Sequence, residues 1–152
     1  MKAIQDFIPD NHCYGCGPAN PKGMQIKSYL ENDTSVCTYM PRPEQCAGPT
    51  QFVYGGTIAS LIDCHSIGTS IANYYKRDGY EVGEGPTVWC VTGNLNVRYL
   101  KPTPIDKPVT LRATIRECTD RKTVVDCTLS SDDVVTAQGE VVAIRVADDW
   151  RK

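Results

Sequence analysis

The chain has 152 residues, of which 41% are hydrophobic and 22% are charged, and its formal net charge is -2. This length suits one domain with a sizeable core, so we expect a single domain over residues 1–152. The nearly balanced charge gives no electrostatic reason to expect nucleic acid or an anionic membrane as a partner.

The N-terminus, MKAIQDFIPDN, lacks the apolar core of a secretion signal, and no run approaches the length of a membrane span. We therefore expect a cytoplasmic protein. Its eight cysteines are then expected to be reduced thiols, because a core of this size needs no disulfide framework. Three of them, Cys37, Cys90 and Cys127, lie in strand-like runs, where free cysteine behaves as a small core residue.

The first part of the chain predicts loops and one hairpin. Residues 1–23 are rich in Gly, Pro, Asn and Cys and predict an ordered loop with a tight turn at NPKG, residues 20–23. MQIKSYL and TSVCTYM predict a hairpin around ENDT. Residues 41–51 are predicted to form a second loop.

Residues 52–79 predict one long helix, followed by β structure. A glycine pair stands at the entrance of the helix, which is expected to end at Gly79 after Lys76 and Arg77. A strand over residues 87–101 and three further strands complete the chain, and VTLRATI shows the alternation of a half-buried strand. A single helix cannot supply the crossovers of a parallel sheet, so the order predicts an antiparallel sheet packed on one helix.

Asp63 is the only formal charge between residues 57 and 75 of the predicted helix. At 3.6 residues per turn it lies almost opposite an apolar stripe. The stripe consists of Ile58, Leu61, Ile62, His65, Gly68, Thr69 and Ala72. Ile67 and Ile71 share the Asp63 face, so we expect that face to be covered as well, most simply by a second copy of the chain.

Two interpretations of Asp63 stay open at this point. A buried, unpaired carboxylate is costly and tends toward a raised pKa, which makes it a candidate for a functional site. Alternatively, it is a structural residue bonded to Ser60, Ser66 or water.

The glycine pair, Gly55 and Gly56, offers backbone amides at the start of the helix. Such amides favour developing negative charge, as in an oxyanion hole, although a loop that needs glycine's freedom would look the same. Eight residues of helix rise roughly 12 Å, so Gly55 and Asp63 of one chain cannot reach the same atom. Two antiparallel helices related by a twofold axis could bring them together, which suggests a site shared across a dimer.

Three motifs resemble the hot-dog-fold acyl-CoA thioesterases of the phenylacetate-degradation type: YGGTIASLIDCHS, HCYGCGPANPKGMQI and LNVRYLKPTPIDKPVTLRATI. The similarity runs over residues 12–146. It implies an α+β hot-dog fold, in which an antiparallel sheet wraps around one long central helix. It also implies a homodimer or a homotetramer built as a dimer of dimers.

The resemblance assigns roles by position. Asp63 stands where the family has its catalytic Asp or Glu, Gly55 where a backbone amide polarises the thioester carbonyl, and Thr92 where a hydroxyl helps to place water. Gly56 belongs to the same glycine pair and is expected to contact substrate. Tyr54 replaces the family's usual His, which can reshape the pocket.

Further substrate-binding residues are expected around these positions. A loop amide of some members would fall at Gly48, and Gln51 nearby is the candidate substitute. Arg98 and Lys101 either meet the phosphates of coenzyme A or are ordinary strand and loop charges.

The remaining candidate groups favour structural interpretations. Cys13 and Cys16 have the spacing of one zinc-ligand pair, but no second pair exists, so we expect this loop to carry no metal. His65 lies on another face of the helix than Asp63, and is expected to be a core residue. Cys64 has no base placed beside it, and a neighbouring carboxylate disfavours its thiolate.

The expected function is hydrolysis of an acyl-CoA thioester to the acid and free CoA, with Asp63 as general base or nucleophile and with no cofactor beyond the CoA of the substrate. Two alternatives stay open. A hot-dog enoyl- or hydroxyacyl-CoA hydratase would want a histidine where Tyr54 stands. A non-catalytic acyl-CoA-binding module would not need Asp63.

Overall fold

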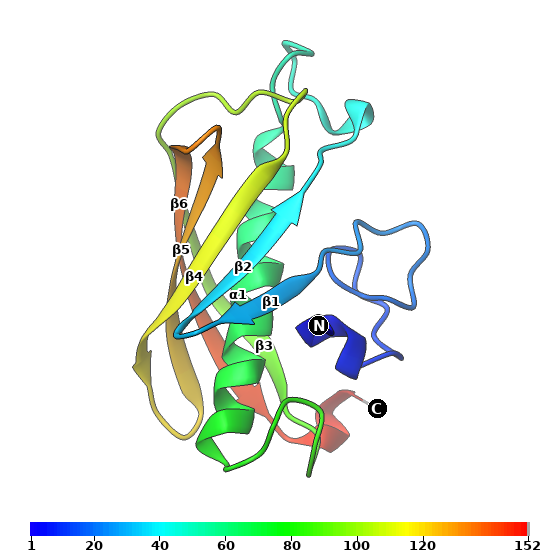
Figure 1. The fold of residues 1–152 in the computed structure, drawn as a ribbon, viewed down its shortest axis with the longest axis vertical. Coiled ribbons are helices and arrows are strands. Elements are labelled where there is room, and N and C mark those ends of the chain that lie inside the picture. Colours follow the sequence, from blue (N-terminus) through cyan, green and yellow to red (C-terminus); the bar gives the residue numbers. More distant parts are fainter. Residues whose placement is uncertain (152) are drawn as a thin grey trace.

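The structure is a computed structural model that describes residues 1–151. One long helix, α1, runs along one face of a curved six-stranded sheet (Figure 1). The elements are η1 Ile4–Phe7, β1 Ser28–Glu31, β2 Thr34–Tyr39, η2 Pro43–Gln45, α1 Gly55–Arg77, β3 Trp89–Tyr99, β4 Val109–Cys118, β5 Lys122–Ser131, β6 Val134–Val146 and η3 Asp148–Arg151. No helix within residues 1–151 is long and apolar enough to cross a membrane.

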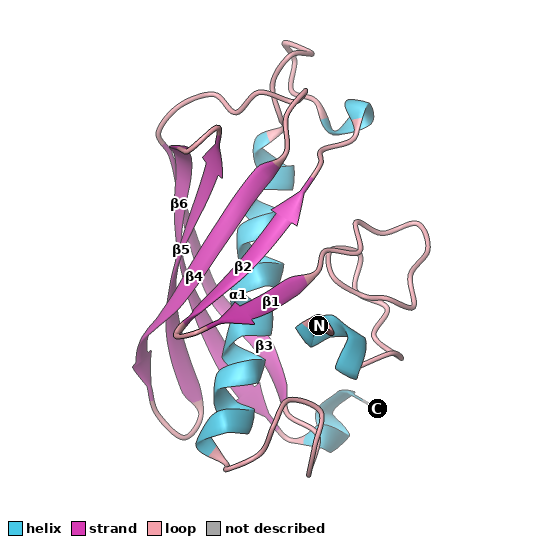
Figure 2. Cartoon of the chain, in the orientation of Figure 1, coloured by secondary structure: helices cyan, strands magenta, loops and turns pink. Residues whose placement is uncertain are grey.

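The sheet is antiparallel throughout, in the strand order β1-β2-β4-β5-β6-β3. Figure 2 shows α1 as the one long helix, with only short helical turns elsewhere. The predicted architecture is therefore confirmed: an antiparallel sheet packs on one long helix, and four of its strands follow that helix in the chain. β1 is shorter than predicted, because the amides of Met24 and Ile26 bond the carbonyls of Tyr14 and Gly15 in the N-terminal loop rather than a neighbouring strand.

Helix α1 is buried along both of its long faces. Every member of the predicted stripe is buried under the sheet. On the opposite face, Ile71 and Tyr74 are also buried, in a cluster that includes Ile8 of the N-terminal segment and Val88 beside β3. The chain's own N-terminal segment and sheet thus bury part of this face, and cover of the remainder by a second copy stays a prediction.

His65 anchors a buried polar network between the helix and the first hairpin. Its Nε2–H donates to the carbonyl of Ser35 at 3.0 Å, so Nδ1 accepts from the Ser28 hydroxyl at 2.8 Å. Gln5 bonds both the hydroxyl and the amide of Ser28, and Thr69 contacts the Ser35 hydroxyl. The prediction of a core histidine is confirmed, and the network ties the N-terminal segment to α1.

Strand β3 forms one edge of the sheet and contains a β-bulge between Thr92 and Asn94. Cross-strand partners lie on the same face of a sheet. Thr92 pairs with Ala143 and Tyr99 pairs with Ala137, and the two alanines are buried on the face that meets α1. The extra residue, Gly93, therefore turns Thr92 and Tyr99 to the same side of the sheet.

The buried His65 predicts a pH-dependent stability. Burial lowers its pKa from 6.5 to about 4, so between these values the unfolded chain binds more protons than the folded chain. The His65 contribution is full above pH 6.5 and is lost as the pH falls toward 4. We expect the free energy of unfolding, measured by urea denaturation, to fall by about 3 kcal/mol across this window.

The control is His65→Gln, which keeps a polar side chain but does not titrate. Its stability should change much less between these pH values. Asp63, whose pKa is raised, contributes to the pH dependence of stability with the opposite sign. Because it does so in both proteins, its contribution cancels when their pH slopes are compared. Equal pH slopes for the two proteins would contradict a buried neutral His65.

Candidate active site

Within residues 1–151, the carboxylate of Asp63 has one hydrogen-bond partner, the hydroxyl of Thr92, which donates to Oδ1 at 2.6 Å. Asp63 lies in the middle of α1, and Thr92 lies immediately before the bulge of β3. The proposed structural partners do not bond it: Ser60 donates to the carbonyl of Gly56, and Ser66 lies buried without a partner among the described residues. Asp63, the predicted general base or nucleophile, is thus in contact with Thr92, which the resemblance names as the hydroxyl that helps to place water.

Asp63 and Thr92 line an apolar cavity of about 270 Å³, here called the Asp63 cavity. Among its described lining residues, Asp63 alone carries a formal charge. The lining comprises Ile4, Gln5, Ile8, Asn11, Cys13, Cys16, Asp63, Cys64, Ile67, Gly68, Ile71, Trp89, Cys90, Val91, Thr92 and Trp150. Burial raises the pKa of Asp63, and the Thr92 hydrogen bond partly opposes this rise. The cavity therefore combines a carboxylate of raised pKa with room for an apolar group.

Gly55 and Gly56 form the first turn of α1 rather than the loop before it. Within residues 1–151 neither amide N–H has a hydrogen-bond acceptor, as expected for the first turn of a helix. The Tyr99 hydroxyl donates to the carbonyl of Gly55 at 2.7 Å, and the Tyr54 ring lies against Gly56, where a Cβ atom would come within 2.4 Å of it. Gly56 thus allows the Tyr54 ring to pack on the helix start.

A second depression, here called the Gly55 depression, lies at the start of the helix. It is lined by Ala47, Phe52, Val53, Gly55, Ile58, Tyr99, Leu100, Lys101, Pro102 and Thr103. It does not include Asp63, and eight residues of helix separate Gly55 from Asp63 by roughly 12 Å. Within one chain the two groups therefore belong to different cavities.

The remaining predicted residues are spread more widely. Lys101 lines the Gly55 depression. Arg98 pairs with Gln138 on the outer face of the sheet, away from both cavities. Gln51 and Gly48 lie exposed in the loop before α1, and neither lines the Asp63 cavity or the Gly55 depression.

Sequence reasoning missed one cluster at the rim of the Asp63 cavity. The sulfur atoms of Cys13, Cys16 and Cys64 all lie within 4.8 Å of one another; we call this set the three-cysteine cluster. Hydrogen bonds with Cys16 and Cys64 lower the pKa of Cys13, whereas hydrogen bonds with Cys13 and Cys16 raise the pKa of Cys64. Only the tertiary fold brings Cys64 to the loop, so spacing along the sequence could not reveal it.

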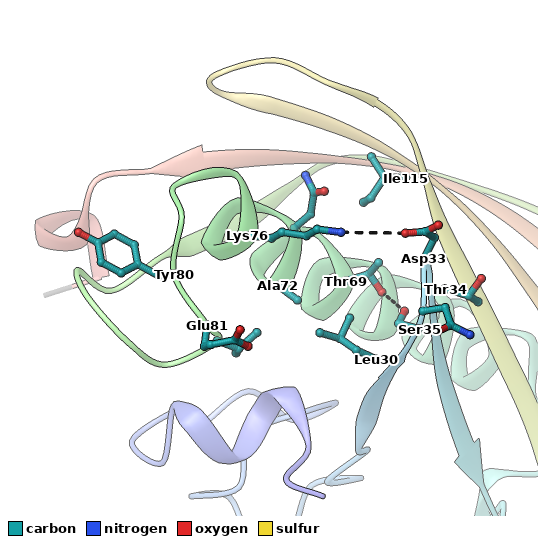
Figure 3. A pocket seen from close by; sticks show the side chains of 13 residues that line it. Leu30, Asp33, Thr34, Ser35, Thr69, Ala72, Lys76, Tyr80, Glu81 and Ile115 are labelled. Atoms are coloured by element: carbon teal, nitrogen blue, oxygen red, sulfur yellow. Dashed lines mark hydrogen bonds and ion pairs between the residues drawn. The ribbon is translucent and has the colours of Figure 1, made fainter.

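A larger cavity of about 550 Å³ lies on the other side of α1, between the helix and the first hairpin (Figure 3). Its side chains include Asp33 and Lys76, whose charged groups are 4.0 Å apart and exposed. None of the residues predicted from the sequence to form the site lines this cavity. Volume alone therefore does not identify the reactive centre.

Residues 50–138 match the family model of the thioesterase superfamily. This segment spans more than half of the chain and includes the glycine pair, Asp63 and Thr92. The chain therefore belongs to the thioesterase superfamily, and the resemblance drawn from its motifs is confirmed.

Individual relatives agree with this assignment. Acyl-coenzyme A thioesterase THEM4 of Mus musculus is 32% identical over 105 residues, which are 69% of this chain and 40% of that protein. The chain thus spans well under half the length of this curated relative. A thioesterase superfamily protein from Shewanella loihica PV-4 has a TM-score of 0.67 at 34% identity and covers 91% of this chain and 96% of its own.

The PaaI protein of E. coli, from the phenylacetic acid degradation operon, shares the fold. Its TM-score is 0.67 at 18% identity, over 85% of each chain. The predicted hot-dog fold is thereby confirmed.

The contact between the N-terminal loop and α1 makes Gly15 sensitive to substitution. A Cβ atom at Gly15 would lie 2.4 Å from the Cys64 sulfur, whereas one at Gly48 would meet nothing within 4 Å, and neither glycine has a positive φ. We expect Gly15→Ala to lower the free energy of unfolding by about 1–3 kcal/mol. The matched control, Gly48→Ala, should leave stability unchanged or raise it by up to about 1 kcal/mol. Urea denaturation compares them, and equal stabilities would contradict the close packing of Cys64 on the loop.

Proposed function

We propose that the protein hydrolyses acyl-CoA thioesters to the free acid and CoA. The observation that carries the proposal is the Asp63 carboxylate, hydrogen-bonded to Thr92 and facing an otherwise uncharged cavity. A carboxylate with a raised pKa in such surroundings is suited to take a proton from water or to attack a carbonyl. The unpaired amide of Gly55 at a helix start is suited to stabilise an oxyanion.

The substrate is expected to carry an apolar, uncharged acyl group. The Asp63 cavity is lined mainly by isoleucine, tryptophan, cysteine and valine side chains. At about 270 Å³ it is smaller than the usual pocket for a complete drug-sized ligand. It therefore accommodates an acyl group, while the bulk of CoA lies outside, where Lys101 at the Gly55 depression is placed to meet a phosphate.

The complete site is proposed to form between two copies of the chain. β3 is an eleven-residue edge strand, and exposed apolar side chains accompany it, with Leu95 37% and Tyr99 54% exposed. Such an edge is suited to pair with another strand. A twofold axis beside β3 would place the Asp63 cavity of one subunit near Gly55 of the partner subunit. A homodimer, alone or within a tetramer, is thus the smallest active unit.

In the proposed reaction, the amide of Gly55 from one subunit polarises the thioester carbonyl held in the cavity of the other. Asp63 takes a proton from a water molecule that adds to the carbonyl carbon, and Thr92 fixes the orientation of the carboxylate. The carbon–sulfur bond then breaks, and the proton passes to the departing CoA thiolate. Direct attack by Asp63, with later hydrolysis of the resulting anhydride, uses the same geometry. Neither route requires a metal or redox cofactor for the chemical step.

A panel of acyl-CoAs tests the activity. Release of free thiol supports hydrolysis, whereas absorbance of an enoyl product without free thiol would indicate a hydratase. Saturable binding of the same acyl-CoAs with neither product would indicate a binding module. No histidine is among the described residues of the Asp63 cavity, so hydrolysis is the expected outcome.

Asp63→Asn should lower kcat by about a hundredfold or more, because it removes the base and nucleophile. Asn keeps the size of the side chain and an oxygen that can accept from Thr92. KM should therefore change little. The matched control is Asp33→Asn, in the larger cavity on the other side of α1, which should leave kcat unchanged. Steady-state thiol release measures both, and near-normal turnover of Asp63→Asn would show that the carboxylate is structural.

Gly55→Pro should lower kcat by about a hundredfold or more, as loss of an oxyanion donor does. Gly55 is the first helical residue, where proline is tolerated, and Tyr54 has the extended conformation, φ -59° and ψ 134°, that a following proline requires. The control Gly55→Ala keeps the amide, and its Cβ atom would make only an ordinary contact of 3.5 Å with Tyr99. Loss of activity in both variants alike would point to a steric effect.

Mixed dimers of the same two inactive chains test the shared site. A dimer of one Asp63→Asn chain and one Gly55→Pro chain contains one intact site, formed by the good Asp63 of one chain and the good Gly55 of the other. Dimers isolated with two different affinity tags should recover toward half of the wild-type activity. Dimers that form and stay inactive would contradict sharing, as would a fully active monomer in light scattering at micromolar concentration.

A further inference from the structure

We propose that the three-cysteine cluster binds a zinc ion that fastens the N-terminal loop to helix α1 beside the Asp63 cavity. The sulfur atoms of Cys13 and Cys64 are 3.8 Å apart, and all three sulfurs lie within 4.8 Å of one another. Four ligands at about 2.3 Å from a tetrahedral zinc place neighbouring sulfurs about 3.8 Å apart. The cluster therefore presents one face of such a tetrahedron after only small side-chain movements.

Two of the three sulfur atoms accept hydrogen bonds from groups of the N-terminal loop. The backbone amides of Gly15 and Cys16 donate to the sulfur of Cys13, and the side-chain amide of Asn11 donates to that of Cys16 at 3.6 Å. Asn11 also accepts from the amide of Cys13 at 2.9 Å. Hydrogen bonds to the ligand atoms orient them and are a regular part of metal sites. A thiolate is the form of cysteine that binds metal.

The loop that carries Cys13 and Cys16 is held in place by its own backbone. The amide of Gly17 bonds the carbonyl of Cys13 at 2.8 Å, and the amide of Ile26 bonds that of Gly15 at 3.2 Å. Gly15 has no Cβ atom, which lets the Cys64 sulfur approach the loop. Two ligands therefore come from a preformed turn and the third from a rigid helix, so little ordering is required on binding.

All three cysteines also line the Asp63 cavity. Three thiolates select a soft or borderline ion such as zinc over magnesium or calcium. The expectation of a metal-free loop rested on the lack of a second ligand pair, and the approach of Cys64 removes that premise. The site also connects the N-terminal segment, which lies outside the residues 50–138 that match the family model, to the helix that carries Asp63. The zinc proposal does not depend on the proposed hydrolysis.

The test is metal content of the full chain, purified with its thiols reduced and equilibrated with micromolar zinc. We expect about one zinc per chain by elemental analysis, as in a structural site. Cys13→Ser and Cys64→Ser should each lower the zinc affinity by at least about a hundredfold, because each removes a ligand. The matched control is Cys46→Ser, a free cysteine outside the cluster, which should bind zinc as the wild type does.

Two results would overturn the proposal. One is reduced wild-type protein that holds less than about a tenth of a zinc per chain. The other is zinc binding that survives Cys64→Ser. The purified protein can also contain a disulfide between Cys13 and Cys64. If such protein takes up no zinc after reduction, the proposal is overturned, and the two cysteines form a redox pair instead. If the serine variants do not fold, the absorption spectrum of the wild type with added cobalt tests the site. A tetrahedral spectrum with thiolate charge-transfer bands supports the site, and an octahedral spectrum without these bands refutes the proposal.

Discussion

The structure depends on one constraint: the middle of helix α1 is covered along both faces, so a titratable side chain there is costly unless it has a partner inside the protein. The helix meets this constraint in two different ways. His65 has partners at both ring nitrogens and is kept neutral within the core. Asp63 has a single partner and faces a cavity. The first arrangement leaves no capacity for chemistry, whereas the second leaves a carboxylate oxygen available to a ligand.

Much of this arrangement could be predicted from the sequence. Hydrophobic periodicity predicts the helix and its buried stripe, and a single helix among many strands predicts an antiparallel sheet. Asp63 is the only charge between residues 57 and 75 of the helix, and Gly55 stands at its start, so both candidate groups can be selected without any knowledge of tertiary structure. Thr92 was named only through the resemblance, since nothing local distinguishes it from other strand threonines.

What could not be predicted depends on contacts between distant segments. Periodicity alone left Ile71 and Tyr74 for a second copy, but the chain itself buries them: Ile8 belongs to their cluster, and the Tyr74 hydroxyl donates to the carbonyl of Thr119. Nearby serines were the local candidates for bonding Asp63, but the sheet supplies Thr92 instead. Cys64 completes a cluster with a turn far from it in the chain. In each case the sequence shows that a side chain needs a partner, and only the packing of helix on sheet and loop shows which partner it has.

The bulge of β3 also restricts how the length of this strand can vary. Thr92 and Tyr99 are separated by an odd number of positions and would point to opposite faces of a regular strand. Gly93 corrects this, and its close approach to Ile144 leaves little room for a side chain. Removing one residue from this segment, or inserting one more, would turn either the hydroxyl away from Asp63 or the ring away from the helix start. Only a change of two residues would keep both side chains on the face that meets α1.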